Sequence, residues 1–365
     1  MKVINIVGAR PNFMKINPLV REMKRQQVDQ LLVHTGQHYD QAMSESFFQE
    51  LGIPEPDINL EVGSASHAVQ TAEIMKRFEQ VCLSEHPDMV LVVGDVNSTA
   101  ACSLVATKLG IAVAHVEAGL RSRDRSMPEE INRLVTDVLA DLLFTTSRDA
   151  DANLLQEGIP AEKIHFVGNT MIDSLLLQLD RAKERHTHRR FQVEPGQYAV
   201  LTLHRPANVD EADQLEYIIG TLALVQEQLP IVFPVHPRTA ANLKRFGLEE
   251  KLRNLPGVIM AEPLSYLDFM DLYHRSRLVL TDSGGIQEET TYLQIPCITL
   301  RENTERPITV TEGTNYLTGT NREQILNAFD EIMSKGGKQG RIPEYWDGKA
   351  AMRIVKILLE QKRRD

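Results

Sequence analysis

The sequence is poor in the features of secreted, membrane and metal-binding proteins. Its three cysteines, Cys82, Cys102 and Cys297, form no CxxC pair, which argues against a disulfide framework or a zinc ribbon and predicts buried, unreactive thiols. No apolar run approaches the roughly 18 residues that a membrane-spanning helix needs. Residue 2 already opens a strand-like run, without the basic and long apolar segments of a secretory signal. We therefore expect a cytoplasmic protein that spans no membrane.

Positive charge and common catalytic motifs are also scarce. The chain has 40 basic and 50 acidic side chains and a net charge of −10, which opposes binding to nucleic acid and to anionic lipid. It has no GxGxxG, HExxH or GxSxG motif, so it shows no dinucleotide fingerprint, no zinc-protease site and no serine nucleophile elbow. An anionic small ligand is compatible with this composition if cations and backbone N–H groups gather locally to hold it.

Length and hydrophobic pattern together predict two domains. A chain of 365 residues exceeds the roughly 250 to 300 residues at which single cores stop growing. Short β-branched runs alternate with amphipathic runs in both halves, which predicts an α/β fold with two parallel, doubly wound sheets. We expect Rossmann-like domains over residues 1–174 and 195–345. A charged segment from residue 181 to Pro195-Gly196 is the expected linker.

The expected elements follow from the individual runs. In the first half, expected strands cover 3–7, 30–35, 89–93, 111–116 and 142–146, and expected helices cover 18–26, 67–84 and 99–109. In the second half, expected strands cover 198–202, 231–234, 258–260, 278–280 and 297–300, and expected helices cover 212–228, 266–275, 286–293, 322–334 and 350–362. A ligand of two such domains is expected in the crevice at the carboxyl ends of their strands.

A candidate diphosphate site follows one strand-like run of the second half. The Ser283-Gly284-Gly285 turn opens a helix, whose free N–H groups and positive dipole end suit an anion. Glu288 or Glu289, about a turn further on, could accept hydrogen bonds from ribose hydroxyls. The alternative is an ordinary capped helix with acidic residues in its first turn.

Cations follow other strand-like runs and could pair with the same diphosphate. In the first half, Gly8 permits a tight turn, Arg10 can fork onto a phosphate, and Lys15 supplies a second cation near the start of the next helix. A structural turn with a solvated arginine is the alternative for this segment. The cations of the second half are His204, Arg205, His236, Arg238, Arg301 and Arg306.

Three acidic residues of the first half are candidates for acid–base chemistry. Asp95 and Glu117 end neighbouring strands and are expected to point into one crevice, where nearby carboxylates raise one another's pKa. Glu129 follows Pro128 at the expected start of a helix. There it could take part in proton transfer or only complement the helix dipole.

These residues lie in motifs that resemble, in order, those of the non-hydrolysing UDP-N-acetylglucosamine 2-epimerases. The resemblance extends over nearly the whole chain, and the number and fixed order of the motifs make it specific. The matching stretches are GARPNFMK from Gly8, HTGQHYD from His34, VGDVNST from Val93, AHVEAGLRS from Ala114, MPEEINR from Met127, VGNTMIDS from Val167, LTLHRPANV from Leu201, TDSGGIQEE from Thr281 and ENTERP from Glu302.

The resemblance implies a fold, a reaction and an assembly. The fold is the glycosyltransferase-B type, two Rossmann-like domains facing a cleft, with the last helix, about 350–365, packed back on the first domain. The reaction is reversible conversion of UDP-N-acetylglucosamine into UDP-N-acetylmannosamine, without NAD or a metal. A base takes the C2 proton, UDP leaves as a glucal forms, and UDP adds back after reprotonation on the opposite face. The expected assembly is a homodimer.

Residue roles carry over at the matched positions. Asp95, Glu117 and Glu129 match the family's acid–base carboxylates, and His204 serves the diphosphate. The other matches are phosphate and sugar contacts at Arg10, Lys15, Ser283, Gly284, Gly285 and Arg306, the ribose carboxylate at Glu289, and uracil contacts at Leu264, through its backbone, and Phe269.

Two departures from the family leave questions open. Asp40 replaces a glutamine of the Gln-His-Arg-Gln segment in substrate-activated bacterial members, so the sequence does not decide whether substrate activates this protein. The loop from Leu203 to Asn208 differs from the Gly-His-Arg-Arg form of those members, which leaves the sugar open. The alternatives are an epimerase of UDP-2,3-diacetamido-2,3-dideoxyglucuronate, a hydrolysing epimerase that releases free N-acetylmannosamine, a glycosyltransferase of the same architecture, and a UDP-sugar sensor without turnover.

Overall fold

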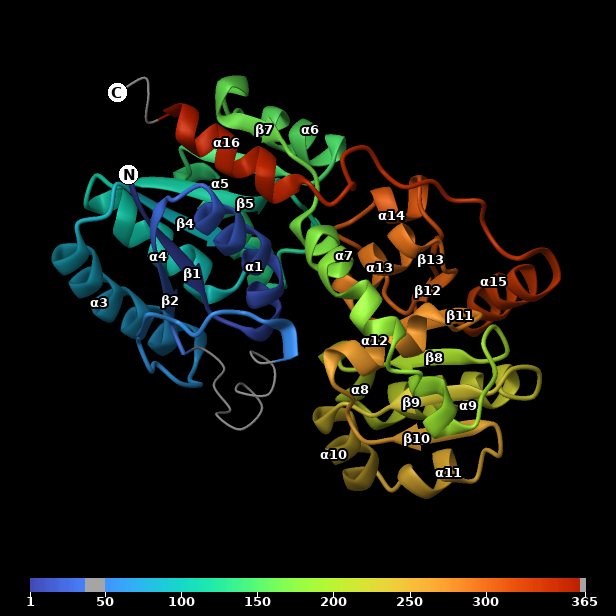
Figure 1. Ribbon diagram of the computed structural model, residues 1–365. Coiled ribbons are helices and arrows are strands. Elements are labelled where there is room, and N and C mark those ends of the chain that lie inside the picture. Colours follow the sequence, from blue (N-terminus) through green and yellow to red (C-terminus); the bar gives the residue numbers. More distant parts are fainter. Residues whose placement is uncertain (37–49, 362–365) are drawn as a thin grey trace. The chain divides into compact units, whose positions relative to one another are not determined.

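The computed structural model describes residues 1–36 and 50–361. The chain forms two compact units. Unit 1 consists of Met1–Leu176 and Glu344–Asp365, and unit 2 consists of Leu177–Pro343. Each unit has one parallel sheet with helices packed on it (Figure 1), so the α/β class with two Rossmann-like sheets is confirmed.

The sheet of unit 1 has seven parallel strands in the order β3-β2-β1-β4-β5-β6-β7. All residues of β4 are buried, because helices cover both faces of a central parallel strand. The order reverses between β1 and β4, which makes the gap between these strands the topological switch point where ligands of Rossmann-like sheets bind. The strands are β1 (Lys2–Val7), β2 (Asp29–His34), β3 (Ile58–Asn59), β4 (Met89–Val93), β5 (Ala112–Ala118), β6 (Leu142–Thr145) and β7 (Ile164–Phe166).

The helices of unit 1 pack their apolar sides on this sheet. Phe78 and Ile74 of α3 and Cys102 of α4, all fully buried, belong to one core with the strand residues Val90 and Leu143. The helices are α1 (Arg10–Arg25), α3 (His67–Glu85), α4 (Asn97–Lys108), α5 (Pro128–Leu139), α6 (Arg148–Gln156), the 3-10 helix η1 (Ala161–Lys163), α7 (Thr170–Lys183, which continues into unit 2) and α16 (Ala350–Gln361).

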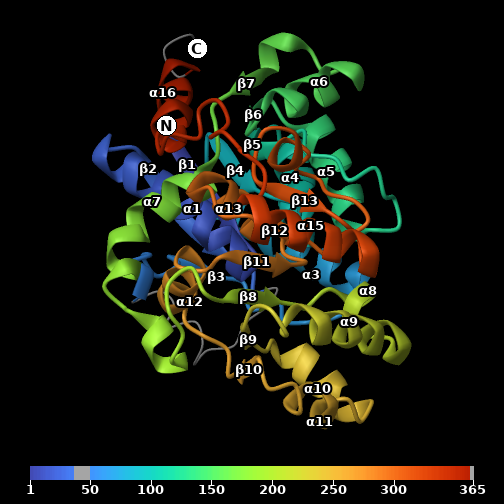
Figure 2. The same cartoon turned by 90° about the vertical axis from the view of Figure 1, so that its right-hand side faces the viewer.

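The sheet of unit 2 repeats the same topology with six parallel strands in the order β10-β9-β8-β11-β12-β13. Figures 1 and 2 show these strands stacked in this order in both views. The switch point lies between β8 and β11. The strands are β8 (Ala199–Thr202), β9 (Ile231–Pro234), β10 (Val258–Ala261), β11 (Leu278–Thr281), β12 (Cys297–Thr299) and β13 (Asn315–Leu317).

The helices of unit 2 complete a second, separate core. Ile218 and Leu222 of α9 and Phe329 of α15 pack with Leu201 and Phe233 of the sheet, and all five side chains are buried. The helices are the 3-10 helix η2 (Thr187–Phe191), α8 (Pro206–Val209), α9 (Ala212–Val225), α10 (Pro237–Arg245), α11 (Glu249–Arg253), α12 (Tyr266–His274), α13 (Gly284–Leu293), α14 (Ile308–Thr311) and α15 (Arg322–Lys335).

The chain passes from unit 1 to unit 2 inside helix α7, which ends at Lys183, within the segment expected as the linker. η2 lies within the stretch expected as linker and is fixed in unit 2, where the Thr187 amide donates to Asp271 at 2.6 Å. Arg275 also donates to the Lys183 carbonyl at 2.8 Å. Charged residues at the surface of packed helices therefore resemble a linker in sequence. The structure divides the chain at 176/177 and 343/344, and the sequence predicts domain edges at 174, 195 and 345.

Helix α16 returns to unit 1 and lies against α1 (Figure 1). Its start is capped by the buried Asp173 of α7, which accepts hydrogen bonds from the amides of Ala350 at 3.2 Å and Ala351 at 2.8 Å. Trp346, also buried, donates from its indole N–H to the Thr146 carbonyl at 3.0 Å. Capping by a side chain distant in sequence satisfies the free amides of the first helical turn.

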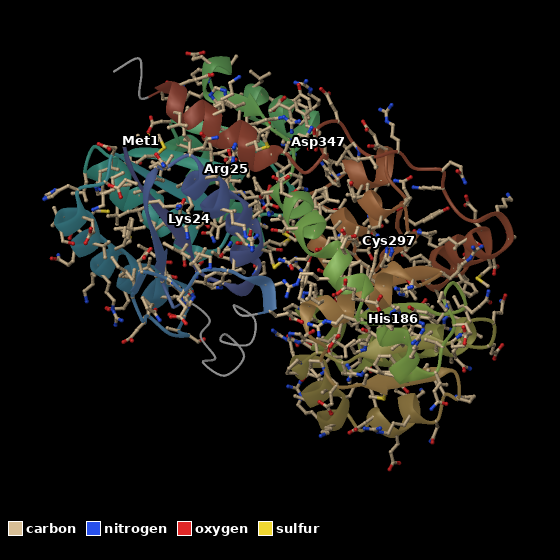
Figure 3. The ribbon with its side chains drawn as sticks, viewed as in Figure 1. Met1, Lys24, Arg25, His186, Cys297 and Asp347 are labelled. Carbon is tan, nitrogen blue, oxygen red and sulfur yellow. The ribbon has the colours of Figure 1, made fainter. Side chains whose placement is uncertain are left out.

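The cysteines are free and buried, as the sequence predicts. Cys82 and Cys102 lie in unit 1 and Cys297 lies on β12 of unit 2 (Figure 3). Burial raises the pKa of Cys82 and of Cys297 to about 11, which keeps these thiols protonated. In the ranges 1–36 and 50–361, no helix is both long enough and apolar enough to cross a membrane.

Candidate active site

The turn after β1 is tied to the end of β4 at the switch point of unit 1. The side-chain oxygen of Asn12 accepts hydrogen bonds from the amides of Gly8 at 3.2 Å and Ala9 at 2.9 Å. Its side-chain nitrogen donates to the Val93 carbonyl at 3.0 Å. Arg10 is the first residue of α1. One asparagine therefore holds the predicted phosphate-binding turn beside the strand that leads to Asp95.

Glu117 adopts an uncommon backbone conformation at the end of β5. Its φ is +73°, and the pairing of β5 with β6 shifts register between Val116 and Ala118, which marks a bulge at this residue. A non-glycine residue with positive φ costs on the order of 1–3 kcal/mol and is found where a side chain must be aimed at a particular place. The bulge turns the Glu117 carboxylate toward Lys15 of α1, with which it forms a buried ion pair.

Gly94 leaves the space that this ion pair needs. A Cβ at Gly94 would lie 3.2 Å from the Lys15 ammonium nitrogen and 3.4 Å from Glu117 Oε2, and the φ of Gly94 is +70°. Glycine is the residue that meets both demands without strain. The Lys15 side chain thus contacts a predicted catalytic carboxylate, whereas the family resemblance implies only a phosphate or sugar contact for it.

Asp95 lies two residues after the end of β4 and is held by two consecutive residues of α5. Arg133 Nη1 lies 2.5 Å from Asp95 Oδ2, and the Asn132 side chain donates to the Asp95 carbonyl at 2.9 Å. The backbone register pairs Val93 of β4 with Val116 of β5. Asp95 and Glu117 therefore leave neighbouring strands at the same edge of the sheet, as the sequence predicts.

The adjacent residues Glu129 and Glu130 differ completely in environment. Glu130 is buried and accepts from the amides of Ser122 at 2.9 Å and Arg123 at 3.0 Å and from Arg133 at 2.8 Å. Burial raises the pKa of Glu130, but these donors outweigh it and hold the pKa below its usual value. Glu129 lies in the first turn of α5, as predicted, and is half-buried. In the described part of the chain, no hydrogen bond or ion pair of the Glu129 carboxylate is found.

A buried charge network that the sequence analysis did not identify supports this edge. His115 Nδ1 lies 2.6 Å from Asp137 Oδ1, and His115 Nε2 lies 2.8 Å from the Gly94 carbonyl oxygen. Asp137 also pairs with Arg121 at 2.7 Å and accepts from the Gly119 amide at 3.1 Å. Burial raises the pKa of Asp137, but these cations and donors outweigh burial and hold the pKa low. The network fixes the peptide between Gly94 and Asp95.

In unit 2, His204 follows β8 and is held by Asp282, which follows β11. His204 Nδ1 lies 2.8 Å from Asp282 Oδ1. Asp282 is fully buried and also accepts from the amides of His204 and Arg205, each at 2.9 Å, and from the Asn208 side chain at 3.2 Å. Burial raises the pKa of Asp282, but the bonds from His204 and Arg205 outweigh it, and the pKa is lowered. Asp282 is therefore an anion.

The Ser283-Gly284-Gly285 turn and Arg306 lie together at the same end of the sheet. Ser283 is the residue before α13, and Gly284 is its first residue. A Cβ at Gly284 would lie only 2.7 Å from Arg306 Nη1, so the guanidinium lies against the start of the helix. Arg306 is buried and pairs with Glu288 at 2.9 Å and with Glu305 at 2.5 Å. Cation and helix N-terminus together suit an anion.

Glu289 is a buried carboxylate between two tyrosines of α12. Its two oxygens accept hydrogen bonds from the hydroxyls of Tyr266 and Tyr273, each at 2.7 Å. Burial raises the pKa of Glu289 to about 7, although the tyrosines act in the opposite direction. Phe269 of the same helix is half-buried and contacts the Tyr273 ring at 5.2 Å between centroids. Leu264 lies in the loop between β10 and α12.

Two further predictions concern metals and regulation. Among residues 1–36 and 50–361, no group of three or more His, Cys, Asp or Glu side chains is placed to hold a metal ion. Asp40, which bears on substrate activation, lies outside the described residues.

Known proteins match nearly the whole chain. A family model described as UDP-N-acetylglucosamine 2-epimerase matches residues 21–359. The chain is 44% identical over 363 residues to UDP-N-acetylglucosamine 2-epimerase of Methanocaldococcus jannaschii, covering 98% of this chain and 99% of that protein. It is 40% identical over 363 residues to UDP-2,3-diacetamido-2,3-dideoxy-D-glucuronate 2-epimerase of Pseudomonas aeruginosa, with 98% and 99% coverage.

Solved structures agree with these sequence matches. The M. jannaschii enzyme in complex with UDP-GlcNAc and UDP has a TM-score of 0.91 at 44% identity, covering 99% of this chain and 100% of that one. UDP-GlcNAc 2-epimerase from Neisseria meningitidis, bound to UDP-GlcNAc, has a TM-score of 0.88 at 30% identity, with 99% and 100% coverage. The fold and these matches thus define an isomerase that acts on a nucleotide sugar. The chain belongs to the UDP-N-acetylglucosamine 2-epimerase family, whose members are non-hydrolysing enzymes of the glycosyltransferase-B type.

Proposed function

We propose that the protein interconverts UDP-N-acetylglucosamine and UDP-N-acetylmannosamine by elimination and re-addition of UDP. The single observation that supports this most directly is the pair Asp95 and Glu117. They leave adjacent strands at one sheet edge, and each is held by a buried cation, Arg133 or Lys15. Two carboxylates beside an anionic substrate oppose its binding, and this cost is offset if they transfer protons in the reaction.

The carboxylates of unit 1 carry out the proton transfers at C2. The C2 proton is too weakly acidic for a carboxylate to remove it unaided. The departing UDP must therefore take up the negative charge that develops. One of Asp95, Glu117 and Glu129 removes the proton as the C1–O bond breaks, and another returns a proton to the opposite face. Lys15 pairs with Glu117 before substrate binds and, with Arg10, contacts phosphate or sugar once it is bound.

The strand ends of unit 2 hold the UDP portion. The N-terminus of α13 from Ser283 to Gly285, Arg306 and His204 bind the diphosphate, and they act more strongly as charge builds up on the leaving group. Nearby side chains bind the nucleoside. Glu289 accepts from the ribose hydroxyls with the lone pairs that its tyrosines leave, Phe269 packs on uracil, and the Leu264 backbone hydrogen-bonds the base.

Proton NMR in D₂O tests the reaction. Incubation with UDP-N-acetylglucosamine should give a stable mixture of two UDP-sugars with deuterium at C2. Accumulation of free UDP and N-acetylmannosamine would instead mean hydrolysis. Turnover only of UDP-2,3-diacetamido-2,3-dideoxyglucuronate would assign the chain the activity named for its P. aeruginosa relative.

Isosteric variants test the roles of the carboxylates. Asp95→Asn, Glu117→Gln and Glu129→Gln should each lower kcat by about 10²-fold or more while UDP still binds. The exposed Glu162 of the same unit provides the matched control, and Glu162→Gln should keep full turnover. Unchanged kcat in all three site variants would contradict the mechanism.

We further propose that the enzyme is a homodimer. Helix α5 exposes Ile131 (37%), Val135 (41%) and Val138 (69%) at the spacing of one helical face, an apolar stripe typical of a protein interface. Val135→Glu with Val138→Glu should yield monomers by analytical ultracentrifugation. A wild-type chain that sediments as a monomer would rule the dimer out.

The proposed setting is the cytoplasm, where the product supplies cell-surface polysaccharide synthesis. Free, buried cysteines are consistent with a reducing compartment. Cell fractionation tests the location, and loss of N-acetylmannosamine from surface polysaccharide on gene deletion tests the supply.

A further inference from the structure

Asp282 is placed to control the chemical form of His204. The carboxylate is fully buried, and its Oδ2 accepts from two backbone amides and from Asn208, while Oδ1 faces His204 Nδ1 at 2.8 Å. A carboxylate that is an anion can only accept, so His204 Nδ1 must carry a proton. Nε2 is then the one ring nitrogen that can reach a ligand.

We propose that Asp282 is a positioning residue that keeps Nδ1 of His204 protonated and aims Nε2 at the leaving diphosphate. This inference rests on the proposed function for the role of His204. In the neutral ring, Nδ1–H is the less common tautomer, so its selection requires a fixed acceptor such as Asp282. When the ring is an imidazolium, the buried anion balances its charge, and Nε2–H can donate to an anionic phosphate oxygen.

The ring acts by hydrogen bonding and needs to transfer no proton. During elimination, a carboxylate of unit 1 takes the C2 proton, the C2–H electron pair forms the C1=C2 bond, and the C1–O electron pair leaves on the β-phosphate oxygen. The Nε2–H donor stabilises this new charge more than it stabilises the bound substrate. Its loss should therefore lower kcat more than it raises KM.

The variant Asp282→Asn should change which nitrogen of the His204 ring carries the proton. An amide nitrogen placed at Oδ2 would oppose three donors at 2.9–3.2 Å, whereas at Oδ1 it would oppose His204 Nδ1 and, at 3.2 Å, the His204 amide, which keeps its shorter bond of 2.9 Å to Oδ2. The amide therefore takes the second arrangement and donates to Nδ1. A neutral ring then carries its proton on Nε2, and the imidazolium form is disfavoured because its Nδ1–H would face the amide donor. The variant retains a neutral donor toward the diphosphate but loses the positive charge.

Nitrogen-15 NMR of the histidine rings measures which nitrogen of His204 is protonated in the full-length, ligand-free wild type. This test does not depend on whether an Asp282 variant folds. His204→Gln assigns the signal by its disappearance. At alkaline pH, Nδ1 of His204 should show the shift of a protonated nitrogen and Nε2 that of an unprotonated one. The reverse pattern overturns the inference, even if the enzyme is an active epimerase.

Kinetics of Asp282→Asn then separate positioning from a purely structural role. The two nitrogen shifts should exchange, and kcat should fall about 10-fold, because the neutral donor of the variant replaces a charged one and charge-assisted hydrogen bonds are about twice as strong as neutral ones. Asp271→Asn is the matched control, because Asp271 is equally buried and its carboxylate binds the Thr187 amide and Arg275, neither of which is a candidate site residue.

The outcomes distinguish the two proposals. Exchanged shifts with reduced kcat and little change in KM support the positioning role. An unchanged tautomer, a wild-type kcat, or a kcat loss equal to that of Asp271→Asn overturns it. A wild-type protein with the expected tautomer and no epimerase activity would instead refute the proposed function alone.

Discussion

Replacing Glu289 by glutamine removes a buried negative charge without changing the shape of the side chain. Both carboxylate oxygens accept from tyrosine hydroxyls at 2.7 Å. A glutamine can keep one of these bonds through its oxygen and donate to the other tyrosine oxygen through its nitrogen, because a hydroxyl both donates and accepts. The change therefore isolates the effect of charge.

The expected magnitude follows from the pKa of Glu289. Burial raises it from 4.5 to about 7, and each unit is worth about 1.4 kcal/mol, so the buried charge costs about 3 kcal/mol at neutral pH. Because the folded pKa exceeds the unfolded one, the folded protein binds the extra proton. This contribution to stability is fully present below pH 4.5 and is lost as the pH rises to about 7.

Urea unfolding of wild type and Glu289→Gln between pH 4.5 and 8 measures this effect. The difference in the free energy of unfolding should change by about 3 kcal/mol across the window in favour of the variant at higher pH. Glu227→Gln serves as the control, since Glu227 is an exposed glutamate of the same unit, and it should parallel the wild type. Parallel curves for Glu289→Gln as well would refute the assignment of a titrating buried carboxylate.

The same variant tests the ribose contact. Ribose hydroxyls donate to the ionised form of Glu289, so wild-type affinity for UDP should weaken as the pH falls below about 7. Glu289→Gln should bind UDP more weakly at pH 8 by roughly 10-fold or more, as for loss of a hydrogen bond to a charged group, with little pH dependence. Isothermal titration calorimetry measures both. Equal affinities for wild type and variant at pH 8 would contradict the contact.

Three further substitutions have defined outcomes. Gly94→Ala, which adds a Cβ at positive φ and 3.2 Å from Lys15, should cost about 1–2 kcal/mol in urea unfolding and lower kcat, and full activity would contradict the packing. Lys15→Met leaves the Glu117 carboxylate buried without its cation and should cost about 3–5 kcal/mol. Addition of Glu117→Gln should restore most of that stability, and no recovery would refute the pairing. Asp173→Ala removes the cap of α16 and should cost about 1–2 kcal/mol, with UDP affinity unchanged in calorimetry.

Much of the fold follows from the sequence because buried parallel strands are continuous apolar runs. The runs at 89–93 and 231–234 coincide with β4 and β9. By contrast, β3 has only two residues and β13 only three, too short for a periodic signal. Helix α1 begins at Arg10, eight residues before the expected start, because Pro11 occupies its first turn, where proline is tolerated.

The candidate site is predictable where a residue ends a strand. Asp95 and Glu117 belong to this class. Arg133 and Asp137 do not, because each lies inside a helix and acquires its role from a partner distant in sequence. A signal was nonetheless present, since Glu129, Arg133 and Asp137 recur every four residues and so share one face of α5. Asp282 lay within a recognised motif, but only the fold shows which histidine it contacts.

The return of α16 to unit 1 has a consequence for biosynthesis. Asp173 accepts hydrogen bonds from the amides of Ala350 and Ala351. All of unit 2 lies between Asp173 and these two residues in the sequence. As the chain leaves the ribosome, unit 2 is synthesised in full before unit 1 can receive its last helix. Until then three parts of unit 1 lack the contacts that they have in the folded protein. These are the Asp173 carboxylate, the Thr146 carbonyl that accepts from Trp346, and helix α1, which lies against α16. The unit that is synthesised first is therefore the one that is completed last.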